Sequence, residues 1–320
     1  MEVVNAECAA YMRGMEASSV DAIVTDPPYG LSFMGKCWDG EAPREECWSE
    51  ALRVSKPGAH LMCFGGTRTF HRAAYAIEDA GWEIRDCVMW VYGTGFPKST
   101  DVGRAVMKAG GSKDEVEAWT GWGTCLKPAW EPVIVARKPL EGTVAANVLS
   151  HRTGALNIDA CRVPCRTAGM RGRFPANLAH DGSPEVLGLF PQSRGQQGAL
   201  RGTEPSRTGK YGIYGRFKEG RVPCEPRGDA GSAARFFYCA KASRRERGEG
   251  NDHPTVKPLA LMEWLVKMVT CEGQLVLDPF AGSGTTMLAC ANLRRRCIGV
   301  ELDPHYCEII RSRLEFPEGS

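Results

Sequence analysis

Hydrophobic runs separated by Gly and Pro predict alternating strands and helices at the start of the chain. Residues 20–26 (VDAIVTD) are short, apolar and rich in β-branched side chains, which favours a buried strand, and two prolines follow it. Residues 43–54 have a helical pattern with Pro43 suited to the first turn. The sequence KPG at 56–58 then precedes a second apolar strand, AHLMCFG. This pattern is typical of an α/β protein.

The same alternation continues to residue 137. The segment 67–81 predicts a helix with Thr67 as its N-cap and Gly81 as its C-terminal stop. Two more strands are expected at 83–91 (EIRDCVMWV) and 131–137 (EPVIVAR). A Gly/Pro loop and one helix lie between these two strands, so we expect them at one edge of the sheet, antiparallel to each other.

Residues 138–250 lose this periodicity and are rich in Gly, Pro, Arg and Ser. Regular structure resumes with a helix at 256–270, followed by strands at 274–278 and 297–301 and helices at 283–295 and 304–314. We therefore predict one doubly wound, mostly parallel Rossmann-like sheet, formed by residues 1–137 and 251–320, with 138–250 as an insertion.

The charge distribution supports a separate role for the insertion. The net charge of the chain is only +2, but residues 151–250 contain 18 Lys and Arg against 9 Asp and Glu, so the remainder carries −7. A basic segment beside an acidic body is typical of a module that binds a polyanion, although a solvated arginine-rich loop would have the same composition.

Other compositional features limit the class of protein. The N-terminal segment has no basic, apolar leader, and no run approaches the roughly 18 apolar residues that a membrane helix needs, so we expect a soluble cytoplasmic protein without a membrane partner. The 14 cysteines are scattered through predicted helices and strands without a CxxC pair, which favours reduced thiols. Cys161 and Cys165 come nearest to metal-ligand spacing, with Cys224 and Cys239 much further on, and we predict no metal site.

The first candidate site is Asp26-Pro27-Pro28-Tyr29, directly after the first strand. An exocyclic amino nitrogen is a weak nucleophile because its lone pair is delocalised into the base ring. Acceptors that draw on its N–H groups counter this, and a carboxylate and a carbonyl in a proline-fixed turn are such acceptors. Tyr29 offers a face on which a flipped base can stack, worth about 1–3 kcal/mol. An ordinary strand-to-turn junction also uses Asp and Pro, so the tetrad alone leaves both interpretations open.

The second candidate site is the glycine loop DPFAGSGTT, residues 278–286, between a strand and a helix. Glycines allow the backbone to approach a ligand, and Glu301, 19 residues after Gly282, ends the next strand, where a carboxylate can accept ribose hydroxyls. The loop has neither the Lys of a P-loop nor the third glycine of a dinucleotide site. A nucleoside cofactor fits better than either alternative.

Together these motifs resemble the DNA amino-methyltransferases of the β arrangement, in which DPPY precedes FxGxGT. The resemblance covers residues 20–30, 56–66, 253–258 and 274–314, and the segments GFPKS, WEPVIVARKPL and RFPANL look like phage and prophage members. It implies S-adenosyl-L-methionine as the cofactor, DNA as the partner and the insertion as the target-recognition region. The implied cofactor site consists of Asp278, Phe280, Ala281, Gly282, Ser283, Gly284, Thr285, Thr286 and Glu301, with His253, Thr255 and Lys257 of the HPTVKP segment closing over it.

Within this resemblance, Lys257 is expected to pair with the cofactor carboxylate, and Asp26 to Tyr29 are expected to be catalytic. Relatives usually carry Gly-Asp near the start, whereas this chain has Asn5-Ala6, which leaves the role of that acidic position open. The resemblance is also compatible with a homodimer, and with an enzyme that either has a cognate endonuclease or lacks one.

The predicted reaction is direct methyl transfer to a flipped base, with adenine N6 favoured and cytosine N4 as the alternative. Methylation of cytosine C5 would need a nucleophilic cysteine, and Pro223-Cys224 lacks the surrounding motif. An RNA or protein amino-methyltransferase and a non-catalytic DNA-binding relative are the other readings that the motifs allow.

Overall fold

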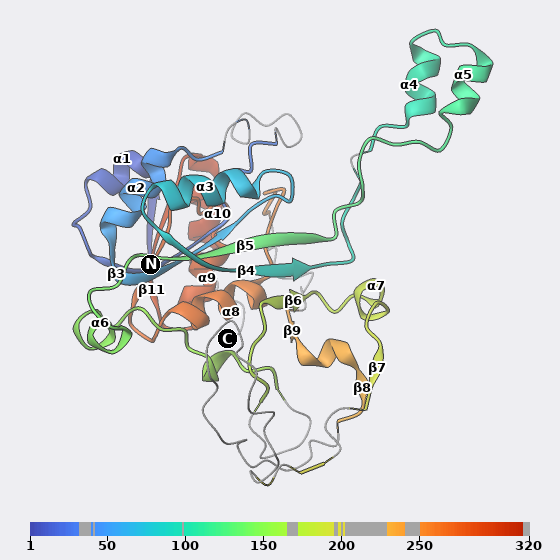
Figure 1. Ribbon diagram of the computed structural model, residues 1–320. Coiled ribbons are helices and arrows are strands. Elements are labelled where there is room, and N and C mark those ends of the chain that lie inside the picture. Colours follow the sequence, from blue (N-terminus) through green and yellow to red (C-terminus); the bar gives the residue numbers. More distant parts are fainter. Residues whose placement is uncertain are drawn as a thin grey trace.

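The computed structural model describes residues 1–31, 40, 42–97, 99–164, 172–194, 198–199, 201, 229–240 and 250–315. Nine strands within these residues form one sheet with helices on both sides (Figure 1). Every pairing in it is parallel except those of one strand, β5, which runs antiparallel to both of its neighbours. This confirms the predicted doubly wound, mostly parallel sheet. In spatial order the strands are β1 (Glu2–Asn5), β11 (Arg296–Glu301), β10 (Leu275–Asp278), β2 (Val20–Thr25), β3 (Ser55–Phe64), β5 (Trp130–Arg137), β4 (Glu83–Val91), β6 (Leu178–His180) and β9 (Tyr238–Cys239).

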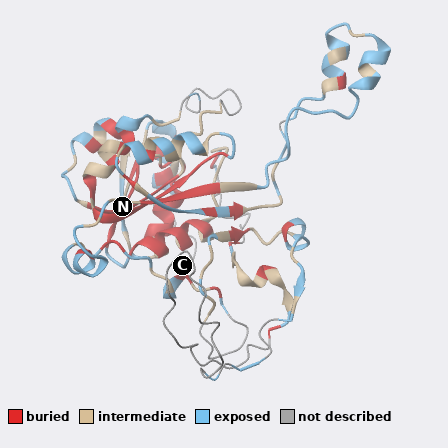
Figure 2. Cartoon of the chain, viewed as in Figure 1, coloured by how far each residue is buried: buried red, intermediate tan, exposed pale blue. Residues whose placement is uncertain are grey.

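Two layers of helices enclose the sheet and bury its centre, which is red in Figure 2. One hydrophobic cluster joins one face of the sheet to α1 (Cys8–Arg13), α2 (Glu45–Val54) and α3 (Phe70–Asp79). A second cluster joins the other face to α8 (Leu259–Val269), α9 (Thr285–Asn292) and α10 (Pro304–Glu315). The molecule therefore has the three layers that a doubly wound chain requires.

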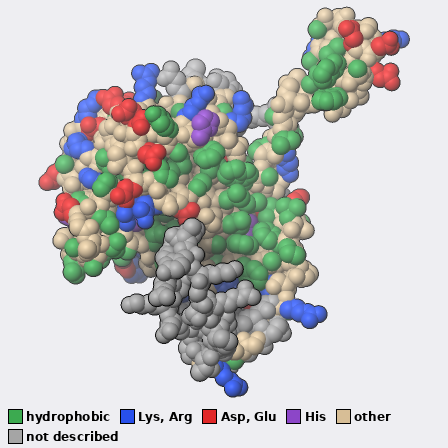
Figure 3. All heavy atoms as spheres, viewed as in Figure 1, with side chains coloured by type: hydrophobic (Ala, Val, Ile, Leu, Met, Phe, Trp, Pro, Cys, Tyr) green, Lys and Arg blue, Asp and Glu red, His purple; other side chains and the backbone are tan. Residues whose placement is uncertain are grey.

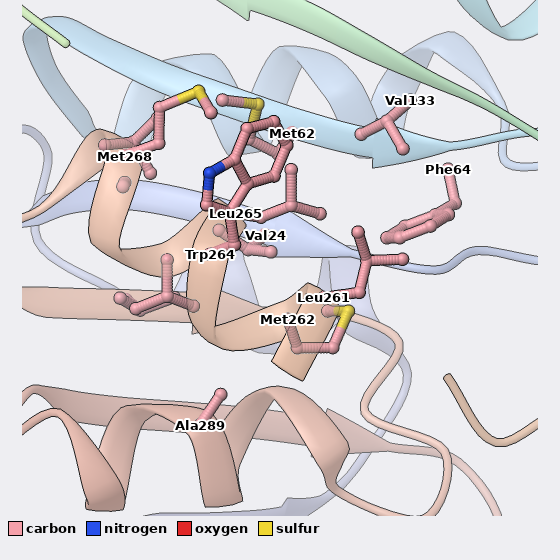
Figure 4. Close-up of a cluster of buried hydrophobic side chains, with 14 of the residues drawn as sticks. Val24, Met62, Phe64, Val133, Leu261, Met262, Trp264, Leu265, Met268 and Ala289 are labelled. Atoms are coloured by element: carbon pink, nitrogen blue, oxygen red, sulfur yellow. The ribbon is translucent and has the colours of Figure 1, made fainter. Parts of the chain in front are cut away.

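Strand β2 shows how the sequence produces these layers. Val20 and Ile23 belong to the cluster under α1 to α3, whereas Ala22 and Val24 belong to the cluster under α8 to α10. Both faces of the strand are buried, so its apolar residues form a continuous run instead of alternating with polar ones. Figure 4 shows the second cluster, where Leu261, Trp264 and Leu265 of α8 lie against Val24 and Met62 of the strands.

Three details differ from the sequence-based expectations. β4 and β5 are antiparallel, as predicted, but they do not form an edge, because β5 lies between β3 and β4, and β6 pairs with β4. The edge strand β1 was not predicted, since its four residues are only partly buried and show no clear pattern. The helix predicted from Thr67 begins at Phe70, because residues 67–69 form a turn.

The segment 138–250 contributes to the sheet as well as to its surroundings. β6 and β9 extend the sheet beyond β4, while α6 (Val144–His151) packs near β3. The buried Asn147 of α6 donates hydrogen bonds to the carbonyls of Pro57 and Thr153. The other elements described in it are the 3₁₀ turns Asp159–Cys161 and Ala233–Phe236, α7 (Pro184–Leu187), β7 (Gln192–Ser193) and β8 (Gly231–Ser232). Residues 165–171, 195–197, 200, 202–228 and 241–249, with most of the arginines expected to contact DNA, lie outside the described residues, as do Cys165 and Cys224.

The segment between β4 and β5 forms a projecting arm, where one helix was predicted. Its two helices, α4 (Val102–Lys108) and α5 (Lys113–Ala118), stand clear of the body at the end of two extended strands of chain (Figures 1 and 3). A capping box between Ser112 and Glu115 starts α5, and Trp119 and Trp122 pack edge to face at 5.2 Å. The arm leaves the body at the carboxyl end of β4 and returns at the start of β5.

Candidate active site

The two candidate motifs meet at one edge of the sheet. β2, which precedes Asp26, and β10, which ends at Asp278, are parallel neighbours, with Ala22 opposite Val276. Parallel neighbours present their carboxyl ends at the same edge, where open α/β sheets bind ligands. The side chain of Thr25 donates a hydrogen bond of 2.7 Å to Asp278 Oδ1 and joins the two strand ends. The two motifs, far apart in the sequence, therefore lie on adjoining strands.

Asp278 points inward at this edge and anchors the start of the glycine loop. Its carboxylate is buried and accepts hydrogen bonds from the Thr25 hydroxyl and, at 3.2 Å, from the Phe280 backbone N–H. Burial raises the pKa of Asp278 to about 6, although hydrogen bonds from Thr286, Thr25 and Phe280 act in the opposite direction. The carboxylate thus holds the turn together.

The glycine loop can adopt its shape only because two positions lack a side chain. Gly282 and Gly284 have φ values of +53° and +82°, in the left-handed region that favours glycine. A Cβ on Gly282 would lie 3.1 Å from His253 Nε2, and one on Gly284 would lie 2.9 Å from two side-chain carbons of Ile310. The loop is therefore tightly enclosed on the side of α10 and His253.

Arg313 and His253 pack against the glycine loop. The buried guanidinium of Arg313 donates hydrogen bonds to the Ser283 carbonyl, to its hydroxyl at 3.2 Å and to the Thr285 hydroxyl at 3.4 Å. The ring of His253 packs edge to face on Tyr306 at 4.6 Å, and its Nδ1 accepts a hydrogen bond from the Thr255 N–H. Arg313 has no motif of its own in the sequence, because only the path of α10 brings it to the loop.

Glu301 lies where a nucleoside would be held. Its carboxylate accepts hydrogen bonds from the N–H groups of Gly282 (2.8 Å) and Asp303 (2.9 Å), which leaves further lone pairs for two ligand hydroxyls. Burial raises the pKa of Glu301. Asn5 donates to the carbonyls of Glu301 (3.0 Å) and Leu302 (2.9 Å), so its side chain fixes the chain after β11. The partly buried acceptor beside a glycine loop fits the adenosine part of S-adenosylmethionine.

Asp26 is held by two donors, one on each oxygen. The Tyr29 hydroxyl donates to Oδ1 at 2.7 Å, and Lys257 Nζ lies 2.8 Å from Oδ2. Lys257 also reaches Glu131 Oε2 at 3.0 Å and the Tyr29 oxygen at 3.1 Å. All three ammonium hydrogens thus have partners within the protein. Lys257 was expected to pair with the cofactor carboxylate, but here its charge lies between Asp26 and Glu131.

The ionisation of this cluster is set by burial and by the two carboxylates. Burial alone would lower the pKa of Lys257, but Asp26 and Glu131 together raise it above its ordinary value. Burial raises the pKa of Tyr29 well above its ordinary value, and Asp26 and Glu131 add to this increase. Lys257 is therefore a cation and the Tyr29 phenol is neutral at physiological pH.

Glu131 is a further member of the cluster that the sequence analysis did not assign. It lies at the start of β5, opposite Trp90, and its Oε1 accepts a long hydrogen bond of 3.4 Å from the Tyr92 hydroxyl. Because β5 runs antiparallel to β3, its N-terminal end lies at the edge where the parallel strands have their carboxyl ends. This reversed direction is what brings Glu131 to Lys257.

A small, mostly apolar pocket adjoins the tetrad, between the carboxyl ends of β2 and β3 and the start of α3. One wall is formed by the tetrad and the opposite wall by residues that follow β3. The lining residues are Pro27, Pro28, Tyr29, Ala42, Phe64, Gly65, Gly66, Thr69, Phe70 and Ala73.

Two general properties concern the described part of the chain. None of its helices is long and apolar enough to cross a membrane. Among the same residues, no group of three or more His, Cys, Asp or Glu side chains is arranged to hold a metal ion.

The fold and these two motifs define an α/β enzyme of the methyltransferase class, with the glycine loop beside the Asp26–Tyr29 tetrad. The sequence profile of the N6/N4 methyltransferase family, described as DNA methylase, matches residues 20–312. The chain therefore belongs to this family of DNA methyltransferases, which act on adenine N6 or cytosine N4 with S-adenosylmethionine as methyl donor.

Individual relatives agree with this assignment. The chain is 26% identical to the type II methyltransferase M.HindIII of Haemophilus influenzae, over 98% of this chain and 94% of that protein. Among solved structures it resembles M1.HpyAVI, determined with S-adenosylmethionine, with a TM-score of 0.50 and 19% identity over 98% of this chain and 99% of that one. It also resembles the cytosine-N4-specific PvuII methyltransferase, with a TM-score of 0.53 and 15% identity over 99% of this chain and 87% of that one. These likenesses to solved structures support the fold.

Proposed function

We propose that this chain methylates the N6 amino group of adenine within a specific DNA sequence, and that Asp26 is the acceptor for that amino group. One observation carries the proposal: Asp26 lies at the end of β2, beside the glycine loop that follows β10. A base amino group at Asp26 and a nucleoside at Glu301 would share one edge of the sheet.

The residues of the chain would divide the work as follows. When bound, S-adenosylmethionine supplies an electrophilic methyl group. Glu301 would accept the ribose hydroxyls, and the loop from Phe280 to Thr286 would enclose the nucleoside. Asp26 and the carbonyl of Pro27 would accept the two hydrogens of the base amino group, which makes the nitrogen lone pair available. Positioned acceptors of this kind need no covalent intermediate and no cysteine nucleophile.

Entry of a base would change the contacts of Tyr29. Its ring lines the apolar pocket, while its hydroxyl is bound to Asp26. A base that leaves the DNA stack could lie against this ring, since stacking on an aromatic side chain offsets part of the cost of unstacking. We therefore propose base flipping, with Tyr29 and Pro28 contacting the flipped base.

Adenine is favoured over cytosine N4 because the tetrad begins with Asp, as in the adenine-specific relatives that the motif resembles. The segment 138–250 is proposed to contact the DNA through its excess of positive charge, so affinity should fall as salt is added. A homodimer and a phage origin stay predictions from the resemblance, and a cytoplasmic location stays a prediction from the composition.

The test combines a product analysis with one substitution and a control. Unmethylated DNA, amplified by PCR from a bacterial genome, is incubated with the protein and S-adenosylmethionine, digested to nucleosides and analysed by mass spectrometry. We expect N6-methyladenine from the wild type and from Asp79→Ala, an exposed carboxylate at the end of α3. Asp26→Ala should give no product while retaining its affinity for S-adenosylmethionine. N4-methylcytosine as the product would overturn the choice of base, and an active Asp26→Ala would overturn the role of Asp26.

A further inference from the structure

We propose that Glu131 is a positioning residue for methyl transfer, which acts by holding Lys257 between two carboxylates and so keeps the acceptor cluster around Asp26 net negative. The proposal rests on the proposed role of Asp26 as the acceptor of the base amino group. Among the described residues, Glu131 contacts neither the carboxylate of Asp26 nor the glycine loop. It is linked to Asp26 through Lys257 at 3.0 Å and through a long hydrogen bond of 3.5 Å from the Tyr29 hydroxyl.

The contacts of Lys257 connect the two carboxylates. Its Nζ lies 2.8 Å from Asp26 Oδ2 and 3.0 Å from Glu131 Oε2, and it sits over the ring of Phe64 at 4.8 Å. Only 11% of the Lys257 side chain is exposed, against 21% for Asp26 and 23% for Glu131. The ammonium group is thus fixed between two partly buried carboxylates, and loss of either would let it move toward the other.

An ion pair alone does not require the second carboxylate. Asp26 would suffice to neutralise Lys257, and taking another charge out of water costs free energy. With Glu131, the three groups carry a net charge of −1, whereas Asp26 and Lys257 alone would carry none. The second carboxylate therefore changes the electrostatic potential at Asp26, where the amino group is proposed to bind.

The electrostatic potential at Asp26 matters because methyl transfer moves positive charge onto the amino group of the base. As the base amino nitrogen bonds the methyl carbon and the carbon–sulfur bond breaks, the nitrogen gains the positive charge that the sulfonium loses. One hydrogen of that nitrogen then leaves as a proton, for which Asp26 is the proposed acceptor. A net negative cluster stabilises the developing charge, and a neutral one does so less. Glu131 should thus affect the rate of transfer more than the binding of either substrate.

The direct test is Glu131→Gln, which keeps the shape of the side chain and removes its charge. With both substrates saturating, we expect the single-turnover rate on unmethylated PCR-amplified DNA to fall about 30-fold, while the Kd for S-adenosylmethionine stays within about twofold. Glu131→Asp, which retains the charge, should recover part of the rate. The matched control is Glu83→Gln. Glu83 of β4 pairs with Arg137 of β5 at 2.6 Å, at the opposite end of these two strands from Glu131.

A double variant separates the charge from a purely structural role. Lys257→Met together with Glu131→Gln leaves Asp26 alone and restores a net charge of −1. We expect this double variant to react faster than Glu131→Gln, whereas a structural role predicts a rate as low or lower. The second result would overturn the proposal.

A measurement on the free protein needs no turnover. Glu131 helps to hold Lys257 protonated, so its loss should increase the fraction of free amine. Competitive labelling with acetic anhydride at pH 9, followed by peptide mass spectrometry, should show faster acetylation of Lys257 in Glu131→Gln than in the wild type. Equal labelling, or an unchanged rate of transfer, would overturn the role of Glu131. If Asp26→Ala is inactive in the same assay, the proposed function stands despite that failure.

Discussion

Replacement of Gly284 by Ala tests how tightly the glycine loop is enclosed. The position has φ of +82°, and a Cβ there would lie 2.9 Å from Cγ1 and Cγ2 of Ile310 and 3.3 Å from its Cβ. The left-handed conformation costs a non-glycine residue about 1–2 kcal/mol. Insertion of a methyl group into a packed site adds about 1–3 kcal/mol. Gly284→Ala should therefore lower the free energy of unfolding by about 2–5 kcal/mol.

Gly273→Ala is the matched control, since Gly273 has φ of +80° and nothing within 4 Å of an added Cβ. Gly273→Ala should show only the cost of the left-handed backbone conformation. The free energies of unfolding of the two variants, measured in urea, should therefore differ by about 1–3 kcal/mol. In an Ile310→Ala background, which lacks both contacting γ carbons, Gly284→Ala should cost less than it does in the wild type. Equal destabilisation by Gly284→Ala and Gly273→Ala would refute the close contact with α10.

Two further predictions concern the groups that hold the loop. Because the pKa of Asp278 is about 6 in the folded protein and 3.8 without the fold, its ionisation opposes folding as pH rises through this window. Urea unfolding should show the wild type losing about 2 kcal/mol of stability relative to Asp278→Asn between pH 3.8 and pH 6. The opposite slope would contradict burial as the cause. Arg313→Met should weaken the binding of S-adenosylmethionine about tenfold, measured by calorimetry, since a buried charge-assisted hydrogen bond contributes roughly 1.5–3 kcal/mol. Arg311 lies on the exposed face of α10, so Arg311→Met should leave the affinity unchanged. Equal affinities of the two arginine variants would show that the loop holds its shape without Arg313.

The order of the central elements could be predicted because each strand is a short apolar run bounded by Gly or Pro. The strand from Val20 to Thr25 and the strand from Leu275 to Asp278 both have this form. In a doubly wound sheet the carboxyl ends of such parallel strands share an edge, so the pattern alone is sufficient to place Asp26 and the glycine loop at the same edge. Local pattern and a general topological rule were sufficient for this part of the site.

The reversed strand could not be placed in the same way. The pattern of Glu131 to Arg137 shows that a strand exists, but its position between β3 and β4 depends on pairing across the whole sheet. The contact of Glu131 with Lys257 joins residues 126 positions apart and follows only from that pairing. Arg313 illustrates the same limit, because its partner Ser283 lies in the glycine loop, 30 residues away.

The three carboxylates at the carboxyl ends of β2, β10 and β11 show how one topology can place the same functional group in different surroundings. Asp26, Asp278 and Glu301 follow or end β2, β10 and β11, which are consecutive in the sheet. Asp278, the middle one, is buried and accepts hydrogen bonds from a hydroxyl and a backbone N–H, so it shapes the loop. The outer two stand about two strand spacings apart, about 10 Å, and both are only partly buried. Each therefore keeps acceptor capacity for a ligand, with the nucleoside end proposed at Glu301 and the base at Asp26. Among the described residues, Lys257 contacts Asp26 and not Glu301, so of these two carboxylates only the proposed base-binding one is paired with this cation. A change at Lys257 can therefore alter the acceptor strength of Asp26 without a change at Glu301.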